Sequence, residues 1–144
     1  MLLRPAKMED ADTLLIWRNH AETRKAFHNS SEIGEQEHFL WMAKAIKNPK
    51  LIFYVAEVDG VLVGTVRAAF TDNVWALSWT VSPKARGNEV GKKMVSEFTN
   101  QISAPLRAEI KDGNFASIKV AEHAGMKFSR KAGNVLHYFR GSSL

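Results

Sequence analysis

The sequence predicts a mixed α/β fold in which a central, mostly antiparallel sheet carries helices on both faces. Two observations support this prediction. β-branched and aromatic runs alternate along the chain with stretches whose apolar residues recur at helical spacing. Short turns join three successive β-rich runs, whereas a helical stretch separates the third run from the next. The length of 144 residues, with 45% hydrophobic residues, predicts one domain over residues 1–144.

The N-terminal part is predicted to contain one short strand and two helices. Residues 2–5 form the strand, which Pro5 ends. Apolar residues at helical spacing predict helices over 8–19 and 34–47. The polar segment between these helices, HAETRKAFHNSSE at 20–32, is predicted to be irregular.

The middle of the chain predicts an antiparallel meander of three strands. The runs at 51–58 and 61–70 flank Asp59-Gly60, and this dipeptide favours a type I′ hairpin turn. A third strand at 74–81 follows after the turn residues Thr71-Asp72-Asn73. Along this strand Trp75, Leu77 and Trp79 share one face, and Ala76, Ser78 and Thr80 share the other. We expect one of these two faces to line a substrate pocket.

The C-terminal part begins with a change to helical periodicity. Apolar residues from Val90 to Ile102 predict a helix with one buried stripe, followed by a strand at 106–110. Because this strand–helix–strand passage is too long for a hairpin, the strands at 74–81 and 106–110 are predicted to be parallel neighbours.

The last quarter of the chain predicts a helix and a hairpin. Asn114 is a good N-cap for a helix that continues to His123, and Gly125 suits the position after its C-terminus. A final hairpin is predicted from the runs at 126–131 and 134–140.

Composition limits the function classes. A net charge of +5 favours anionic partners, although it also serves solubility. The basic residues do not form one block, so no nucleic-acid partner is expected, and a nucleic-acid-binding module rests on charge alone. The chain has no cysteine, which excludes disulfides and thiolate nucleophiles. His20, His28 and His38 lack the spacing of metal ligands, so no metal is expected.

No membrane association is expected either. The first ten residues, MLLRPAKMED, have no apolar signal-peptide core, and no run reaches the length of a membrane span. We therefore expect a cytoplasmic protein.

The stretch at 81–98, VSPKARGNEVGKKMVSEF, combines the features that a phosphate site needs. It supplies basic residues, two glycines and the start of a helix, directly after a strand. It matches neither a Walker loop nor a dinucleotide-binding fingerprint. On spacing alone, a phosphate site and a basic connection between strand and helix both stay open.

The order of elements, together with two motifs, resembles the GNAT superfamily of N-acetyltransferases over nearly the whole chain. Residues from Arg86 to Gly91 match the family pattern Arg/Gln-x-x-Gly-x-Gly/Ala, and NFASIKVAEHAGMKF from Asn114 matches its second motif. The resemblance implies a GNAT-like sandwich, acetyl-CoA as co-substrate and no metal. The residues that it implies for coenzyme binding are Val81, Arg86, Gly87, Asn88, Val90, Gly91, Lys92, Asn114 and Ser117.

The acceptor is less closely defined. IWRNHAETRKAF and EHFLWM resemble acetyltransferases that act on amino-sugar nucleotides, which implies a primary amine of a small molecule. Enzymes that acetylate protein N-termini remain an alternative. The candidate substrate-binding residues are Trp17, Arg18, Asn19 and Trp79, and the protein is expected to be a monomer or a homodimer.

The usual catalytic groups of the family are missing. The positions of its Glu and Tyr correspond to Ala76 and Ala121, so direct transfer from acetyl-CoA would need other proton carriers. The candidate catalytic residues are Tyr138, His28 and Ser78, with Glu57 and His123 as further candidates. A non-catalytic acyl-CoA-binding domain therefore stays open.

Glu89 is a further departure, because it replaces a glycine of the family pattern. A carboxylate beside a phosphate is unfavourable. Either the Glu89 side chain points away from the phosphates, or coenzyme A binding is weak or lost. We expect the first outcome, because Arg86, Gly87, Gly91 and Lys92 of the motif are present.

Overall fold

A computed structural model describes residues 1–87 and 89–142 and contains one seven-stranded sheet in the order β1-β2-β3-β4-β5-β7-β6. Among the strand pairs of the described residues, β4–β5 is parallel and the others are antiparallel. The predicted mixed, mostly antiparallel sheet is therefore confirmed. The strands are β1 (Leu2–Pro5), β2 (Leu51–Val58), β3 (Val61–Thr71), β4 (Val74–Val81), β5 (Leu106–Lys111), β6 (Lys127–Ala132) and β7 (Val135–Arg140).

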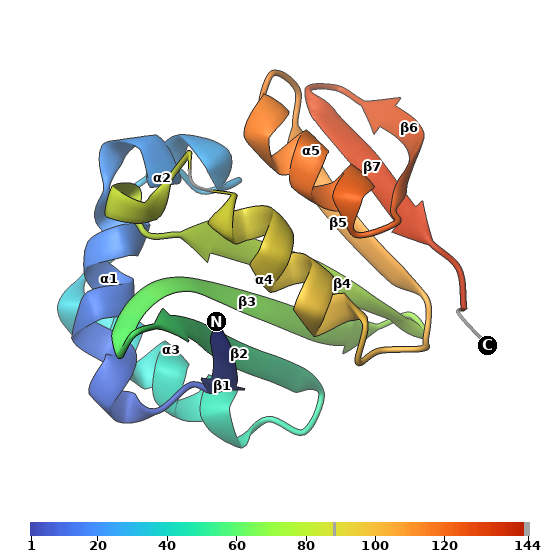
Figure 1. The fold of residues 1–144 in the computed structure, drawn as a ribbon. Coiled ribbons are helices and arrows are strands. Elements are labelled where there is room, and N and C mark those ends of the chain that lie inside the picture. Colours follow the sequence, from blue (N-terminus) through green and yellow to red (C-terminus); the bar gives the residue numbers. More distant parts are fainter. Residues whose placement is uncertain (88, 143–144) are drawn as a thin grey trace.

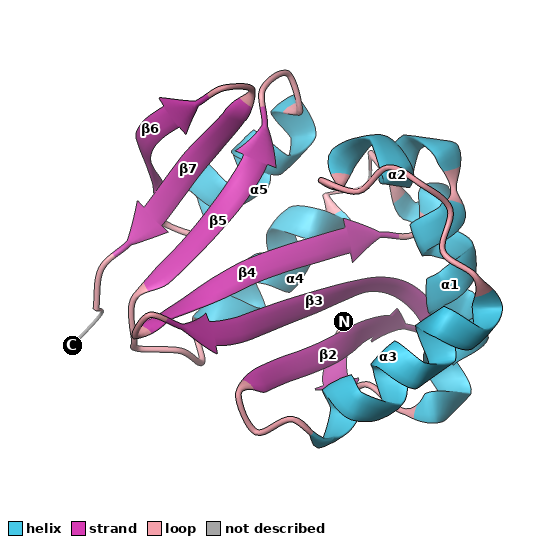
Figure 2. Cartoon of the chain, turned by 180° about the vertical axis from the view of Figure 1, so that it is seen from behind, coloured by secondary structure: helices cyan, strands magenta, loops and turns pink. Residues whose placement is uncertain are grey.

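Helices cover both faces of this sheet, as predicted (Figures 1 and 2). α4 and α5 lie on one face, and α1 and α3 lie on the other. The helices are α1 (Ala11–Asn19), α2 (Ala21–Ala26), α3 (Glu35–Lys47), α4 (Val90–Thr99) and α5 (Phe115–His123), with short 3-10 turns η1 (Met8–Asp10) and η2 (Pro83–Ala85).

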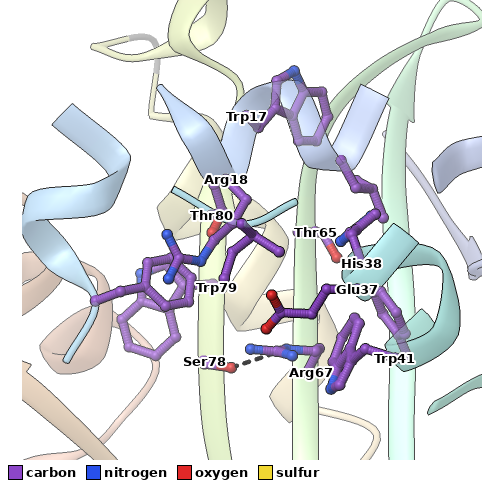
Figure 3. A pocket seen from close by; sticks show the side chains of 14 residues that line it. Trp17, Arg18, Glu37, His38, Trp41, Thr65, Arg67, Ser78, Trp79 and Thr80 are labelled. Carbon is purple, nitrogen blue, oxygen red and sulfur yellow. Dashed lines mark hydrogen bonds between the residues drawn. The ribbon is translucent and has the colours of Figure 1, made fainter. Parts of the chain in front are cut away.

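Each face of the sheet has its own hydrophobic core. Under α4, the buried stripe of Met94, Val95 and Phe98 packs with β3 and β4 residues such as Val66 and Leu77. On the other face, the cluster contains Leu14, Trp17, Met42, Phe53 and Val55. On that face a pocket lined by Ser78 and Thr80 also lies between the sheet and the helices (Figure 3).

The turns of the meander confirm the predicted hairpins. Asp59 and Gly60 both have positive φ angles, 51° and 79°, which is the conformation of a type I′ turn. Asp72 and Asn73, with φ angles of 54° and 64°, connect β3 to β4 in the same manner. Short polar side chains at these positions tolerate the left-handed region better than branched ones.

Two details differ from the sequence prediction. The segment predicted to be irregular contains the six-residue helix α2, so that prediction is wrong for residues 21–26. Its sequence AETRKA contains good helix formers but no apolar stripe that would indicate a buried helix. α4 ends at Thr99, before Ile102, whose N–H still donates to the Thr99 carbonyl over 3.0 Å.

The parallel strands β4 and β5 pair over only part of their length. The register pairs Trp75 with Leu106, Ala76 with Arg107 and Leu77 with Ala108, and no further pair follows. Beyond this point β5 continues in register with β7, and the two parallel strands diverge (Figure 1). The sheet is therefore open at the carboxyl ends of β4 and β5.

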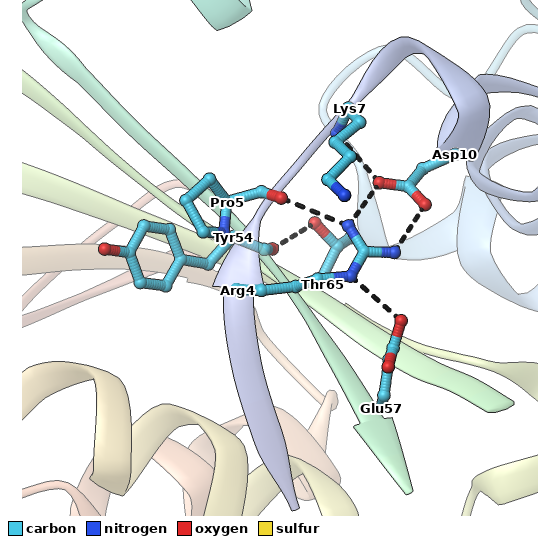
Figure 4. Close-up of polar contacts among 7 residues, drawn as sticks. All are labelled: Arg4, Pro5, Lys7, Asp10, Tyr54, Glu57 and Thr65. Atoms are coloured by element: carbon cyan, nitrogen blue, oxygen red, sulfur yellow. Dashed lines mark hydrogen bonds and ion pairs between the residues drawn. The ribbon is translucent and has the colours of Figure 1, made fainter. Parts of the chain in front are cut away.

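An ion-pair network fixes the start of the chain against the sheet (Figure 4). The Arg4 guanidinium donates to both Asp10 carboxylate oxygens, over 2.9 and 2.8 Å, and to Glu57 over 2.9 Å. Asp10 also accepts from the Lys7 N–H over 2.8 Å. The Asp10 side chain is only 6% exposed. Burial opposes its ionisation, but the hydrogen bonds from Arg4 and Lys7 outweigh burial, so the pKa of Asp10 is lowered.

Replacing Asp10 with Asn should lower the free energy of unfolding by about 2 kcal/mol at pH 7, because Arg4 loses a bidentate, charge-assisted partner. The folded pKa of Asp10 lies below its unfolded value. The contribution of the Asp10 carboxylate to the free energy of unfolding is therefore fully present above about pH 4, and it is lost as the pH falls through the folded pKa. Urea unfolding of wild type and Asp10→Asn between pH 2 and 7 checks this expectation. If the difference in free energy of unfolding between the two proteins stays constant or grows towards low pH, the expectation is contradicted.

Candidate active site

A cleft of about 820 Å³ occupies the opening between β4 and β5. Its walls come from four parts of the chain: α2, the end of β4, the loop that leads into α4, and the turn and helix after β5. The residues that line it include Thr23, Lys25, Trp79, Val81, Arg86, Gly87, Glu89, Val90, Gly91, Lys92, Lys111, Asn114, Ser117 and Lys119.

The loop into α4 presents backbone N–H groups to this cleft. Gly87 has a φ of 84°, a conformation that L side chains rarely adopt. The Glu89 side chain does not cap the start of α4, so its carboxylate leaves the first N–H groups of this helix free to bind another acceptor. Such an end favours an anionic ligand. Asn88, which the sequence placed in this loop, lies outside the described residues.

Gly91 is required by packing as well as by its place on the cleft. A Cβ atom added at Gly91 would lie 3.1 Å from a Val120 methyl and 3.2 Å from a Val81 methyl. The absence of a side chain therefore lets α4 approach α5 and the end of β4 closely. A large residue at this position would disturb the helix packing before it met any ligand.

Glu89 adopts a left-handed conformation with a φ of 62°. A glycine at this position would adopt it without the steric cost of a Cβ atom. The Glu89 side chain is 76% exposed, and its carboxylate lies 3.3 Å from Lys92 Nζ. The carboxylate is therefore directed to solvent and its charge is offset by a lysine.

The start of α5 forms another wall of the cleft. The Asn114 side chain accepts a hydrogen bond from the Ser117 N–H over 3.2 Å, which confirms the predicted N-cap. Asn114 and Ser117 both line the cleft. Ala121, at the position of the family's Tyr, is completely buried in the core between α5 and the sheet.

Two basic side chains hold α2 across the mouth of the cleft. The Arg86 guanidinium donates to the Thr23 hydroxyl and, over 3.4 Å, to the Val81 carbonyl. From the opposite side, Lys111 Nζ donates to the Lys25 carbonyl over 2.9 Å. α2 is thus tied to both diverging strands.

A second, smaller pocket of about 280 Å³ lies on the face of the sheet covered by α1 and α3 (Figure 3). Its walls are largely apolar and aromatic. β3 and β4 supply its floor, through the paired residues Thr65 with Thr80 and Arg67 with Ser78. The remaining lining residues are Leu14, Trp17, Arg18, Phe27, Ile33, Glu37, His38, Trp41, Phe53 and Trp79.

The cleft and the pocket meet at the end of β4. Phe27, Trp79 and Thr80 line both of them. The Trp75 N–H donates towards the β5 side, to Pro105, so alternation along the strand turns the backbone groups of Trp79 and Val81 the same way. Because β5 has diverged there, these groups point into the opening rather than to a strand partner.

Three of the four predicted substrate residues line the pocket, namely Trp17, Arg18 and Trp79. Asn19 does not, because its side chain is used to fix the adjoining loop. Its amide donates to the Ile33 carbonyl over 2.8 Å and accepts from the Ile33 N–H over 2.7 Å. Asn19 therefore positions Ile33, which does line the pocket.

The structure does not bring the predicted catalytic residues together. Ser78 lines the pocket, where its hydroxyl accepts a long hydrogen bond of 3.3 Å from Arg67. His28 is 61% exposed and lies 3.8 Å from Glu109. Tyr138 is 5% exposed within the core, burial raises its pKa, and it lines neither cavity.

The two further candidates also lie outside both cavities. Glu57 is bound to Arg4, and His123 lines a shallow depression beside Lys92 and Lys93 on the outer side of α4.

The sequence reasoning missed Glu37, Arg67 and Trp41. Figure 3 shows the Glu37 carboxylate pointing from α3 towards the centre of the pocket, above the Arg67 guanidinium. Arg67 stands alone as a charge within the run VLVGTVRAAF, and period-2 alternation puts it on the face of Thr65. A charged residue in the middle of a strand was therefore the available signal for this site.

Neither a metal cluster nor a membrane-spanning helix occurs in the part of the chain that the structure describes. No three His, Asp or Glu side chains among these residues gather in a way that could hold a metal ion. None of the described helices is long and apolar enough to cross a bilayer.

Comparison with known proteins identifies the family. The model of the acetyltransferase (GNAT) domain matches residues 1–127, which is most of the chain. The chain therefore belongs to the GNAT family of acetyl-CoA-dependent acetyltransferases, and the resemblance noted in the sequence is confirmed at this level. Among curated proteins, none matches it significantly.

Solved structures share the fold at low sequence identity. The ribosomal-protein-alanine N-acetyltransferase of Brucella melitensis has a TM-score of 0.81 and 21% identity, covering 97% of this chain and 99% of that one. A phosphinothricin acetyltransferase from Sinorhizobium meliloti, in complex with acetyl-CoA, has a TM-score of 0.82 and 21% identity, covering 98% and 88%. An aminoglycoside acetyltransferase with coenzyme A and kanamycin has a TM-score of 0.81 and 14% identity, covering 96% and 93%.

The cleft between β4 and β5 fits the family's co-substrate. It offers a helix start that the Glu89 side chain does not cap, unpaired strand edges for an extended amide-bearing chain, and the lysines and arginine of its rim. The smaller pocket adjoins this cleft at Phe27, Trp79 and Thr80.

Changing Glu89 to Gly should raise the free energy of unfolding by about 0.5–1 kcal/mol, because it removes the steric cost of a left-handed non-glycine residue. The exposed pair with Lys92 contributes little, so its loss should not reverse this gain. Coenzyme A affinity should stay the same or increase. Thermal unfolding and calorimetric titration of both proteins provide the measurements, and a large loss of affinity would show that the Glu89 carboxylate has a binding role.

Proposed function

We propose that this protein transfers the acetyl group of acetyl-CoA to a primary amine of a small molecule held in the pocket between α1, α3 and the sheet. One observation carries the proposal: the coenzyme-sized cleft and the smaller pocket share Phe27, Trp79 and Thr80 at the end of β4. Two cavities that meet at one point allow both reactants to be held in attack geometry, which supplies much of the acceleration in a direct transfer.

The reaction is a single displacement. The amine nitrogen forms the new amide bond with the acetyl carbon, the thioester C–S bond breaks, and the proton released by the amine balances the departing thiolate. The products are the N-acetylated amine and coenzyme A.

Backbone groups of this chain would serve the donor side. The first N–H groups of α4, at Val90, Gly91 and Lys92, are suited to the pyrophosphate, and Arg86 and Gly87 would complete the loop. The Val81 N–H, which faces the opening, would donate to the thioester carbonyl and stabilise the charge that develops on its oxygen. Asn114 and Ser117 would border the pantetheine portion from α5.

The acceptor side depends on side chains. Glu37 supplies the one carboxylate among the described residues that line the pocket, and we assign to it the proton that the amine must lose before attack. Ser78 would orient the acceptor through its hydroxyl. The sequence resemblance favours an amino sugar on a nucleotide as acceptor, and a protein N-terminus is the alternative.

The decisive experiment is a thiol-release assay with acetyl-CoA across amine classes. The panel contains amino-sugar nucleotides, amino-sugar phosphates, amino acids, polyamines and N-terminal peptides. Turnover of small amines and not of peptides is expected. Peptide turnover alone would contradict the small-molecule proposal, and coenzyme A binding without any turnover would indicate a binding domain.

Arg86→Ala should weaken coenzyme A binding about tenfold or more. The change removes a phosphate partner, and it also releases Thr23 and with it the end of α2. Native mass spectrometry and calorimetry measure the affinity. Lys84→Ala is the matched control, because Lys84 precedes Arg86 by two residues, is exposed and does not line the cleft. Equal affinities of the two variants would contradict the assignment of Arg86.

Glu37→Gln should lower kcat about 100-fold, because the amide keeps the shape of the side chain but cannot accept the amine proton at neutral pH. Coenzyme A affinity should not change. The control is Glu35→Gln, which alters an exposed carboxylate on the same helix outside the pocket. If Glu37→Gln retained wild-type kcat, the proton would have to leave by another route.

A further inference from the structure

Arg18 and Arg67 line the smaller pocket, which is proposed to hold the acceptor and is called the acceptor pocket below, and no acidic side chain of a described residue pairs with either of them. Neither Arg18 nor Arg67 lies within ion-pairing distance of a carboxylate of a described residue. Ionised side chains this far from bulk water are usually paired. The lack of a partner is therefore a feature that calls for a physical account.

The contacts of Arg67 are weak for a half-buried guanidinium. Its Nε donates to the Ser78 hydroxyl over 3.3 Å, and its Cζ lies 4.8 Å from the centre of the Trp41 ring. These are one long hydrogen bond to a neutral group and one cation–π contact. The fork of the guanidinium is thus left with unused donors on the pocket side.

Arg18 is held more firmly but also keeps a free donor. One of its terminal nitrogens donates to the Asn29 carbonyl over 2.7 Å, and its Cζ stacks 4.0 Å from the Phe27 ring centre. The other, Nη1, is buried without a hydrogen-bond partner among the described residues. An unsatisfied buried donor is unfavourable, and a ligand can satisfy it.

The pocket has a net positive charge. Arg18 and Arg67 supply two charges, and Glu37 supplies one of the opposite sign. Burial lowers the pKa of His38, which leaves that imidazole neutral at pH 7. Burial and then the proximity of Arg18 lower the pKa of Arg67 to about 10, so Arg67 still carries its charge at neutral pH.

This charge distribution bears on the acceptor. A primary amine reaches the protein as a cation, and a pocket with two unpaired arginines disfavours an acceptor that carries positive charge alone. An acceptor that also carries an acidic group would satisfy the arginines and leave its amine for Glu37. Arg is well suited to such a role, since its planar fork binds carboxylate and phosphate in a bidentate manner.

Building on the proposed function, we infer that the acceptor amine carries an anionic group, a carboxylate or a phosphate, and that Arg67 together with Arg18 binds this group. Polyamines and other purely cationic amines are then poor acceptors. Arg67 pairs in register with Ser78, two residues or about 7 Å along β4 from Thr80, where the two cavities meet. This separation favours acceptors whose amine and acidic group are only a few bonds apart.

The test compares matched pairs of amines that differ in the acidic group. L-Methionine with L-methioninamide tests a carboxylate, and glucosamine 6-phosphate with glucosamine tests a phosphate. Binding is measured through the fluorescence of the pocket tryptophans with coenzyme A present, and turnover is measured by thiol release. In at least one pair, the member with the acidic group should bind ten times or more as tightly as the member without it, and the pair in which this occurs identifies the acidic group.

Arg67→Met supplies the second arm, because it keeps the length of the side chain and removes the charge. In the pair that wild type discriminates, the affinity for the member with the acidic group, divided by the affinity for the member without it, should fall at least tenfold. Arg67→Lys should restore part of the ratio, since it returns the charge without the fork. Arg130→Met on β6, an exposed position outside both cavities, is the matched control and should leave the ratio unchanged. Coenzyme A binding and thermal unfolding report whether each variant is folded.

The outcomes separate this inference from the proposed function. The inference is overturned if both members bind equally in every pair, or if no member binds detectably. It is also overturned if folded Arg67→Met keeps the preference for the member with the acidic group. If Arg67→Met does not fold, the wild-type pairs still decide. Coenzyme A binding together with acetylation only of amines that lack an acidic group would support the acetyltransferase function and would contradict the anionic acceptor. If no amine reacts but acidic amines still bind through Arg67, the acetyltransferase function is contradicted and the binding of an acidic group by Arg67 is supported.

Discussion

The separation of β4 from β5 after the Leu77–Ala108 pair is the constraint on which the rest of this structure depends. Two parallel strands that stayed paired to their ends would bury their backbone groups in the ladder and leave no cleft. Here β5 keeps its partner β7, and β4 keeps β3, so both strands remain stable while they diverge. The unpaired edge of β4 is thereby available to a ligand at no cost to the remainder of the sheet.

The helices on either side adapt to this opening. α4 begins inside it, and Gly91 lets the helix contact both Val81 and Val120. α5 closes the far side, with Asn114 satisfying its first turn. The starts of these two helices therefore differ: α5 is capped by its own residue, whereas α4 is not capped by Glu89. An anion bound at α4 would take the place that a capping side chain has at α5.

This arrangement explains which features could be predicted from the sequence. The hairpin at Asp59-Gly60, the cap at Asn114 and the crossover from β4 to β5 follow from local chemistry and connection length. The donor cleft is built largely from backbone, so its motif could be read from the spacing of glycines and basic residues. Its occupant still had to come from resemblance to a family, because spacing alone left a plain basic connection open as well.

The acceptor pocket could not be predicted to the same extent, because it is assembled from side chains of distant segments. Arg67 on β3, Trp41 on α3 and Trp17 on α1 meet only through the tertiary fold. α2 was missed for a related reason. It has no apolar stripe of its own, and Arg86 and Lys111, which bind it through hydrogen bonds, lie more than sixty residues after the residues that they contact. Tyr138 was a reasonable proton carrier by chemical type, but period-2 alternation in β7 directs it into the core.

The location of the charges refines what the net charge of +5 means for function. Three acids that border or line the cleft are each offset by a lysine: Glu22 by Lys25, Glu89 by Lys92, and Asp112 by Lys131. These pairs are exposed and are worth little to stability, but they prevent a carboxylate field from opposing a phosphorylated ligand. The acceptor pocket also has a net positive charge, but there the charge is held in a largely apolar setting, where charges interact more strongly than at the surface. A positive charge spread over the surface would serve solubility, whereas one concentrated on Arg18 and Arg67 would, under the proposed function, select among amines by the group that each carries beside its nitrogen.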